Sequence, residues 1–188
     1  MLVEKCVFWN ALWGNGLEIG FELNSAEVKN VEFRNSDIIH IEAGAAFSIH
    51  NAGTATVTDI LYNNIRIEDA RQKLFDLAIF RSFYSEDGKI TDVERKQQYL
   101  NGAWDGVLTV TKNEKAAHSK YKGKIKNIVF KNISVVEGLF PFSIFYGANK
   151  NHLVENIIIK NLQVHGKKIF NLQQAKFYMD NVRSINLQ

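Results

Sequence analysis

The sequence has very little cysteine and no long apolar run. Cys6 is the single cysteine among 188 residues, and there is one proline. A lone cysteine excludes an intramolecular disulfide framework and gives no sign of an oxidising compartment, without excluding one. No stretch approaches the roughly 20 consecutive apolar residues of a membrane-spanning helix. The first residues, Met1 to Lys5, lack the basic region and long apolar run of a signal peptide, so the sequence predicts no membrane partner.

Strong charge of one sign and clustered metal ligands are also missing. The net charge is +3. The basic residues concentrate between Lys112 and Lys126, a run typical of a solvated loop, with an anionic partner as the alternative. The 5 histidines are scattered along the chain, and no phosphate-binding loop, Ser-His-Asp order or dinucleotide-binding signature is present. We therefore expect no cofactor, no metal site and no nucleic-acid partner.

One pattern of eight residues recurs along the chain: apolar, polar, Asn or Asp, apolar, any, apolar, any, Asn. Its clearest copies are 28–35, 57–64, 125–132 and 154–161. Segment 3–10 fits in outline, with Lys5 at the third position, and 174–181 is the weakest copy. The closing asparagines Asn10, Asn35, Asn64, Asn132, Asn161 and Asn181 are separated by 25, 29, 68, 29 and 20 residues. Units of 20–30 residues are typical of one turn of a β-solenoid.

The alternation within each copy has a period of two, which predicts strands with one buried face. A second apolar alternation follows each closing asparagine, as at Ile39 and Ile41 and then at Phe47 and Ile49. Asparagine tolerates the left-handed conformation of a bend, and stacked copies would bring equivalent amides to about 4.8 Å, where they form a ladder. We therefore predict an all-β fold, a right-handed parallel β-helix forming a single domain over 1–188; an ordinary mixed sheet with frequent turns is the alternative.

Residues 81–124 interrupt the repeat and are predicted to be an insertion. Thr91 to Glu94 has the form of a capping box, which predicts a short helix over 95–100. Residues 104–111 read as a strand returning to the stack. Insertions of this kind in solenoids often lie on the binding face.

A glycine-rich segment, Gly14-Asn15-Gly16-Leu17-Glu18-Ile19-Gly20, precedes the copy at 28–35, and Ser48-Ile49-His50 follows it. The order and spacing of these elements over 6–69 resemble the glycoside hydrolases of the polygalacturonase family and the related dextranase and isopullulanase group. In polygalacturonases the first motif is Gly-His-Gly-Leu-Ser-Ile-Gly and the second is Arg-Ile-Lys. The resemblance implies a β-helix that, in the complete enzyme, hydrolyses glycosidic bonds of a polysaccharide with inversion, outside the cell or in the periplasm.

The departures from the family pattern are informative. Asn15 replaces the motif histidine, and Ser48 and His50 replace the substrate-binding Arg and Lys. Because acidic sugars require Arg or Lys, a neutral glycan is the expected ligand. The catalytic Asn-x-Asp and Asp-Asp elements of the family would precede Met1, so we expect no catalytic residue in this chain and no activity from it alone.

The substrate-binding residues predicted from these observations are Trp13, Asn15, Glu18 and His50. Trp13 precedes the Gly-Asn-Gly turn and offers an aromatic face on which a sugar ring can stack. His50 would lie one coil on from that turn. A carboxyl pair of Glu18 with Glu42 is a further arrangement that the coil geometry allows.

Two other classes of function remain open from the sequence. One is a non-catalytic carbohydrate-binding or surface β-helix; the other is a structural segment such as part of an adhesin or tailspike. The first strand begins near Leu2 without a helix before it, and open terminal coils expose apolar surface and unpaired backbone groups. We therefore also expect self-association through the first coil.

Overall fold

The computed structural model describes residues 1–9, 11–82 and 120–188, and every regular element in these ranges is a β-strand. No helix that could cross a membrane occurs in them. The larger sheet, sheet A, contains β1 (Leu2–Glu4), β2 (Val7–Phe8), β4 (Glu27–Ile41), β6 (Thr56–Ala70), β8 (Lys124–Val135), β10 (Val154–Val164), β11 (Lys167–Lys168) and β13 (Val182–Leu187). Sheet B contains β3 (Leu17–Ile19), β5 (Ala45–Asn51), β7 (Lys73–Ile79), β9 (Phe142–Tyr146) and β12 (Phe177–Asp180).

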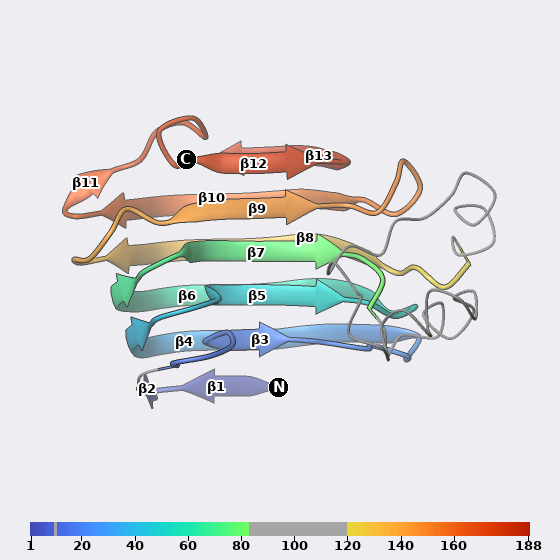
Figure 1. Ribbon diagram of the computed structural model, residues 1–188, viewed down its shortest axis with the longest axis horizontal. Coiled ribbons are helices and arrows are strands. Elements are labelled where there is room, and N and C mark those ends of the chain that lie inside the picture. The colour runs from blue at the N-terminus through green and yellow to red at the C-terminus, as the bar shows by residue number, and fades with distance from the viewer. Residues whose placement is uncertain (10, 83–119) are drawn as a thin grey trace, which may run out of the picture.

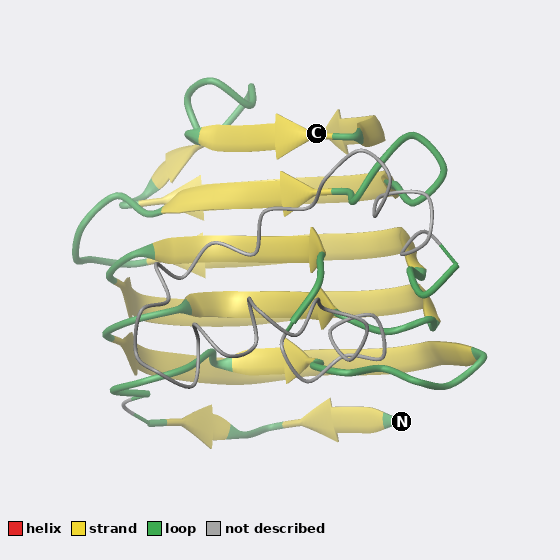
Figure 2. Cartoon of the chain, turned by 45° about the vertical axis from the view of Figure 1, so that its right-hand side comes forward, coloured by secondary structure: helices red, strands yellow, loops and turns green. Residues whose placement is uncertain are grey.

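The strands of both sheets lie side by side in chain order. Sheet A runs β1-β4-β6-β8-β10-β11, with β2 also paired to β4 and β13 to β10, while sheet B runs β12-β9-β7-β5-β3. All pairings are parallel except that of β10 with β11. Figure 1 shows the two sheets as layers, with the chain passing from a strand of one to a strand of the other, and Figure 2 shows only strands and loops among the described residues. The predicted all-β class is confirmed.

The four clear copies of the repeat stack in register in sheet A. Their first residues, Val28, Val57, Ile125 and Val154, are paired from strand to strand. The copies predicted at the two ends are wrong in register. Val3 pairs with Phe33 and Glu4 with Arg34, so Lys5 takes the place of Asn35 and not that of Asn30.

At the other end, the copy predicted at 174–181 is replaced by β13. Val182 pairs with Val154 and Ile185 with Ile157, so the segment that continues the stack begins one residue after Asn181. Ser184 then falls at the third position of the pattern, where it has a φ of 60°. The reason for both errors is that Lys5 and Ser184 occupy left-handed positions where the clear copies have Asn or Asp.

Left-handed residues bend each long strand of sheet A at two points. The third and eighth positions of all four clear copies have φ between 51° and 57°; they are Asn30, Asn35, Asp59, Asn64, Asn127, Asn132, Asn156 and Asn161. Among residues with a side chain, Asn and Asp adopt this conformation at the lowest cost. The amides also bond between strands, from Asn64 to Asn35 at 2.9 Å and from Asn161 to Asn132 at 2.9 Å. The asparagine ladder predicted from the repeat is therefore present, although Asn132 donates to Asn63 and not to Asn64.

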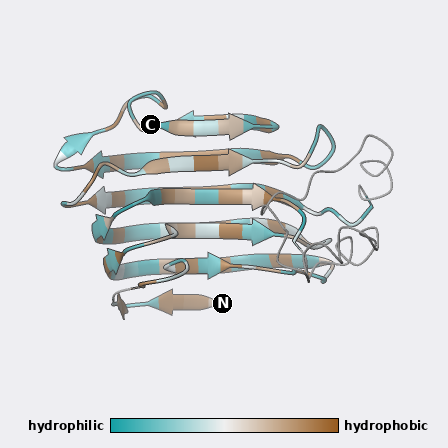
Figure 3. Cartoon of the chain, viewed as in Figure 1, coloured by the Kyte–Doolittle hydropathy of each residue, from teal (hydrophilic) through white to brown (hydrophobic). Residues whose placement is uncertain are grey.

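The core lies between the two sheets. Phe33, Tyr62 and Phe130 stack along sheet A, with ring centroids 5.1 and 4.9 Å apart. Phe47 and Phe75 of sheet B, whose ring centroids are 5.5 Å apart, pack against Tyr62 and Phe130 respectively. Burying each such ring contributes on the order of 2 to 3 kcal/mol, and Figure 3 shows the apolar stretches recurring from strand to strand.

One inward position of the second alternation differs from the prediction. Ile38 and Ile41 are 0% and 1% exposed, whereas Ile39 is only partly buried. The bend at Asn35 shifts the alternation by one residue, because a left-handed residue turns the strand. The short helix predicted at 95–100 and the strand predicted at 104–111 lie outside the described residues.

We expect Asn132 to stabilise the stack through its backbone conformation as well as through its amide. Asn132→Ala should lower the free energy of unfolding by about 2 kcal/mol. Alanine is strained at the left-handed φ, and the variant loses the hydrogen bonds with Asn63 and Asn161. Asn132→Gly should lose about half as much, since glycine adopts that φ without strain. Urea unfolding of both variants, with the exposed neighbour Lys131→Ala as control, measures the difference. Equal losses for alanine and glycine would show that φ is not the cause.

Candidate functional site

Polar side chains form a row across the outer face of sheet B. Glu18 of β3 pairs with Ser48 of β5, and Ser48 pairs with Asp76 of β7. Their neighbours along each strand, such as Phe47 and Ile49, are buried in the core. Because successive residues of a strand face opposite sides, Glu18, Ser48 and Asp76 share the outer face. His50, two residues beyond Ser48, lies on the same face.

His50 joins two carboxylates from the strands on either side of it. Its Nδ1 lies 2.9 Å from Oε1 of Glu18, and its Nε2 lies 3.4 Å from Oδ2 of Asp76. The side chains of His50 and Asp76 are 12% and 7% exposed. Lys73 Nζ also contacts Oδ2 of Asp76. The imidazole is therefore fixed between two strands by groups that accept its protons.

Asn15 fixes the glycine-rich turn against β5 and orients Glu18. Its Nδ2 donates to Oε2 of Glu18 at 2.8 Å, and its Oδ1 accepts the backbone N–H of Ala45 at 2.8 Å. Gly44 adopts a φ of 111° beside this turn, and a Cβ there would lie 2.2 Å from the carbonyl oxygen of Gly14. Glycine at position 44 therefore allows the backbone at Gly44 to approach that at Gly14, which brings Asn15 within hydrogen-bonding distance of Ala45.

Two aromatic rings cover one side of His50. The ring centroids of Phe21 and Phe80 lie 5.4 and 5.7 Å from that of His50, both edge-on, and 4.9 Å from each other. These contacts remove the imidazole from water, which strengthens its interactions with Glu18 and Asp76. We call Asn15, Glu18, His50, Lys73 and Asp76 the sheet B cluster.

The charges of this cluster are strongly coupled. Burial alone lowers the pKa of His50, but the hydrogen bonds to Asp76 and Glu18 and the charges of both carboxylates outweigh it and raise the pKa to about 9. The hydrogen bond from His50 holds the pKa of Glu18 below its usual value. Burial raises the pKa of Asp76, yet hydrogen bonds from His50 and Lys73 make the net shift downward.

At neutral pH the cluster therefore holds two anions and two cations, and its charges cancel. It presents ordered donors and acceptors without a net field, a property suited to neutral polar groups. Neither carboxyl carries a proton at this pH, so neither is prepared to act as a general acid. Among the described residues, no group of three or more His, Cys, Asp and Glu side chains could hold a metal ion.

The structure brings together three of the four residues predicted from the sequence: Asn15, Glu18 and His50. Trp13, the fourth, lies two residues before Asn15 and is 85% exposed. In the described ranges its ring makes no stacking contact, so it is open to solvent beside the cluster.

Asp76 and Lys73 were missed by the sequence reasoning. β7 lacks the eight-residue pattern that identifies the strands of sheet A. A signal was nevertheless present: Leu17-Glu18-Ile19, Phe47-Ser48-Ile49 and Phe75-Asp76-Leu77 are three apolar-polar-apolar triplets, 30 and 28 residues apart. Aligning them would have placed Asp76 in the row.

The carboxyl pair of Glu18 with Glu42 does not form. Glu42 is engaged by His40 Nε2 at 2.8 Å and by Arg71 Nη1 at 2.8 Å. His40 Nδ1 also lies 3.1 Å from Oδ2 of Asp69. The carboxylate that is linked to Glu18, through His50, is Asp76.

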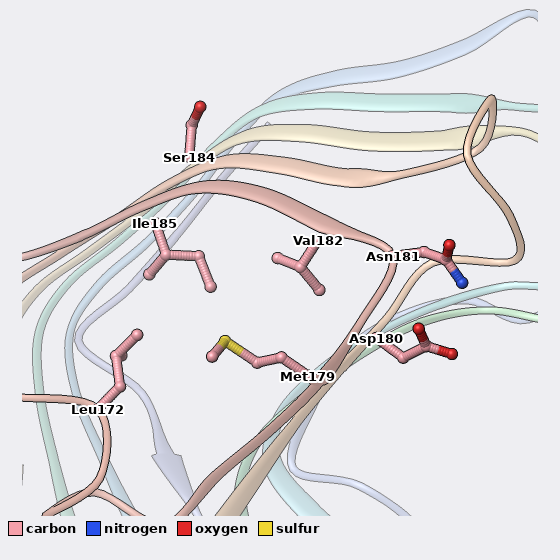
Figure 4. A pocket seen from close by; sticks show the side chains of 7 residues that line it. All are labelled: Leu172, Met179, Asp180, Asn181, Val182, Ser184 and Ile185. Atoms are coloured by element: carbon pink, nitrogen blue, oxygen red, sulfur yellow. The ribbon is translucent and has the colours of Figure 1, made fainter.

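A pocket lies at the other end of the molecule. It has a volume of about 400 Å³ and is lined by Leu172, Met179, Asp180, Asn181, Val182, Ser184 and Ile185, as Figure 4 shows. β12 and β3 are opposite ends of sheet B, so this pocket is remote from Glu18. Its lining combines apolar and polar side chains of the last strands and the loop before them, and it holds none of the predicted binding residues.

We expect His50 to make stability depend on pH in the alkaline range. Its pKa is about 9 in the folded chain, against an ordinary value of 6.5 for a histidine side chain, so its stabilising contribution is complete below pH 6.5 and is lost as pH rises through about 9. The upper limit of this contribution is on the order of 3 kcal/mol. Urea unfolding from pH 6 to 10 should show this decline in the unmodified chain and not in His50→Gln.

His165→Asn is the matched control, because His165 is exposed and has a φ of 52°, which asparagine tolerates. The control should keep the alkaline decline. An unchanged decline in His50→Gln would mean that another group titrates. In acid the dependence on pH is the opposite. Because folding lowers the pKa values of Glu18 and Asp76, their ionised forms stabilise the fold at pH values above the unfolded pKa values, and this contribution is lost as pH falls.

Comparison of the chain with protein-family models, with curated proteins and with solved structures gives no match. The geometry of the sheet B cluster and the motif resemblance at 6–69 are therefore the grounds on which its function is proposed.

Proposed function

We propose that the chain is a stack of coils from a right-handed parallel β-helix. Three features support this: parallel sheets with strands in chain order, in-register copies of one repeat, and left-handed bends at fixed positions of each copy. The right-handed sense follows from the strong preference of parallel crossover connections for that hand. The insertion predicted at 81–124 ends one residue too late, since Lys124 is the first residue of β8 and pairs with Thr56; most of that segment lies outside the described residues.

We further propose that the outer face of sheet B binds a neutral polysaccharide. The observation that carries this is the hydrogen-bonded connection of Asn15, Glu18, His50 and Asp76 across three adjacent strands. Sugar hydroxyls both donate and accept, so they match a surface with fixed donors and acceptors of balanced charge. Exposed Trp13 beside the cluster offers an apolar ring face for sugar C–H groups.

The binding surface belongs, in this proposal, to a polysaccharide-degrading glycoside hydrolase that acts outside the cell or in the periplasm. The motif resemblance supports the class. The lowered pKa values of Glu18 and Asp76 support a binding role for this chain, because a glycosidase needs one carboxyl that stays protonated. The catalytic carboxylates of the complete enzyme would come from coils other than these.

A non-catalytic carbohydrate-binding β-helix is the second candidate. It is favoured by the pairing of both cluster carboxylates with cations. Hydrolysis separates the two candidates: a full-length protein that binds a glycan and never cleaves it belongs to the second class.

We expect the 188-residue chain to bind neutral polysaccharides without cleaving them. Dextran, pullulan and a soluble cellulose derivative, with polygalacturonate as the charged comparison, are suitable ligands for isothermal titration and affinity electrophoresis. His50→Gln and Glu18→Gln should each weaken binding about tenfold or more, because each leaves a buried or half-buried partner unpaired. Trp13→Ala should weaken it by a smaller factor.

Glu68→Gln provides the control, since Glu68 lies on sheet A and pairs with Arg66. It should bind as the unmodified chain does. Binding that persists in His50→Gln and Glu18→Gln would remove the cluster from the site. Release of reducing sugar by the chain itself, abolished in Glu18→Gln, would contradict the binding role and make Glu18 catalytic.

We also propose that the chain self-associates through its first coil. β1 and β3 each have one partner strand among the described residues, β4 and β5 respectively. Leu2 and Val7 on this coil are 48% and 63% exposed. Edge strands with apolar side chains pair readily with other chains.

Sedimentation velocity from about 1 to 100 μM should therefore show a concentration-dependent increase in mass. Val7→Lys should reduce it, since an edge lysine blocks pairing; Val136→Lys, at an exposed site after β8, is the control. A monomer at every concentration would rule out this association.

A further inference from the structure

The polar row on sheet B continues into aromatic residues on the next strands. Asp76 of β7 pairs with Ile144 of β9, which pairs with Tyr178 of β12. In the adjacent row, His50 pairs with Ala78, and Ala78 with Tyr146. Because paired residues of parallel strands share a face, Tyr146 and Tyr178 face the same side as Glu18 and His50. Figure 1 shows β3, β5, β7, β9 and β12 as consecutive strands of one sheet.

Both tyrosines are open to solvent: Tyr146 is the last residue of β9, and Tyr178 is the second residue of β12. Tyr146 is 42% exposed and Tyr178 is 63% exposed. The ring of Phe142 meets that of Tyr178 edge-on, with centroids 5.9 Å apart, and this contact limits the orientations of Tyr178. A rigid, exposed aromatic side chain is preorganised for binding, since little conformational freedom is lost when a ligand stacks on it.

The spacing of these residues defines the length of the surface. Strands are about 4.8 Å apart, so Tyr146 lies about 10 Å from His50 and Tyr178 about 19 Å from Glu18. A ligand that touches both ends must be long, narrow and directed across the strands. Ala78 lies between His50 and Tyr146 in this row. Its side chain is a single methyl group, so it does not project between the two larger side chains.

The charges on this face discriminate between ligand classes. Glu18 and Asp76 are balanced by His50 and Lys73, while Asp180 adds a carboxylate beside Tyr146 in the register of β9 and β12. Binding of a polyanion such as single-stranded nucleic acid depends on Lys and Arg along its phosphates, and the balanced cluster with Asp180 near it offers no surplus of positive charge. Aromatic faces combined with ordered polar groups suit a neutral sugar chain.

We propose that Tyr146 and Tyr178 form an aromatic subsite at the far end of the sheet B surface, which binds a linear neutral oligosaccharide of about four units laid across β3, β5, β7, β9 and β12. This rests on the proposed saccharide-binding function. The sheet B cluster hydrogen-bonds one end of the ligand, and the two tyrosines stack on the other end.

The test is the dependence of affinity on ligand length. Isomaltose to isomaltohexaose, together with the matching maltose and cellobiose series, are titrated into the chain by calorimetry. In the series that binds, affinity should rise with length up to about four or five units. Tyr178→Ala and Tyr146→Ala should each lower affinity for the long members by about five- to tenfold, the value of one aromatic stacking contact. Neither should change affinity for the disaccharide.

Phe170→Ala is the matched control, since Phe170 precedes β12, is 68% exposed and has Lys168 Nζ over its ring. It should leave every affinity unchanged. Circular dichroism and urea unfolding show whether each variant is folded, and Tyr178→Trp, which keeps a stacking face, should retain the preference for long ligands.

Three outcomes overturn the proposal in distinguishable ways. If no series binds and polysaccharides do not bind either, the saccharide-binding function itself is wrong. If short and long ligands bind equally and His50→Gln weakens both, the function stands and the aromatic subsite does not exist. If the tyrosine variants weaken the disaccharide as much as the hexasaccharide, the tyrosines act on the stability of the cluster and not on a separate subsite.

Discussion

The left-handed bend at two fixed positions of each long strand is the constraint on which the rest of this structure depends. A strand of fifteen residues such as β4 or β6 would otherwise continue straight. The bends at Asn30 and Asn35, and at their equivalents in β6, β8 and β10, turn the strand at the same register in each layer. Because the bends coincide, the backbone hydrogen bonds between neighbouring strands remain in register and the inward side chains remain stacked. A single bend out of step would shift every residue beyond it to the opposite face.

The same register determines the sheet B cluster. Glu18, Ser48 and Asp76 are about thirty residues apart in sequence, and they meet because each occupies the same position of its own layer. His50 lies two residues from Ser48 and therefore reaches both flanking carboxylates. The hydroxyl of Ser48 is buried between them without a hydrogen-bond partner among the described residues. A polar group in that state costs on the order of 1 to 3 kcal/mol, so the row contains a local weakness that packing elsewhere offsets.

The sequence was sufficient where one residue type has one physical role. Asparagine at the third and eighth positions of the repeat predicted both the bends and the amide ladder, since few other residues adopt positive φ. Prediction failed at Lys5 and Ser184, which have the same backbone conformation without the residue type that signals it. Prediction also placed Ile39 in the core where Ile38 is the buried residue. The two-residue period of a strand takes no account of the bend at Asn35. In the site, Asn15, Glu18 and His50 followed from their place relative to the motifs, whereas Asp76 lies on a short strand with no motif and became recognisable only through its pairing with Ser48.

The electrostatics of the cluster decide between binding and catalysis more strongly than the identity of its residues does. A glutamate, an aspartate and a histidine on one face would suit acid–base chemistry if their pKa values were spread apart near neutral pH. Here the opposite arrangement occurs: His50 lies between the two carboxylates, its pKa is raised to about 9, and the pKa values of both carboxyls are lowered. Every charge is therefore fixed over the neutral range, and a proton taken from His50 would leave Glu18 without a cation, while Asp76 would keep Lys73. Such a cluster resists proton transfer and keeps its hydrogen-bonding groups in place. In the proposed saccharide-binding function, that rigidity would hold the hydrogen-bonding groups in place for a neutral ligand.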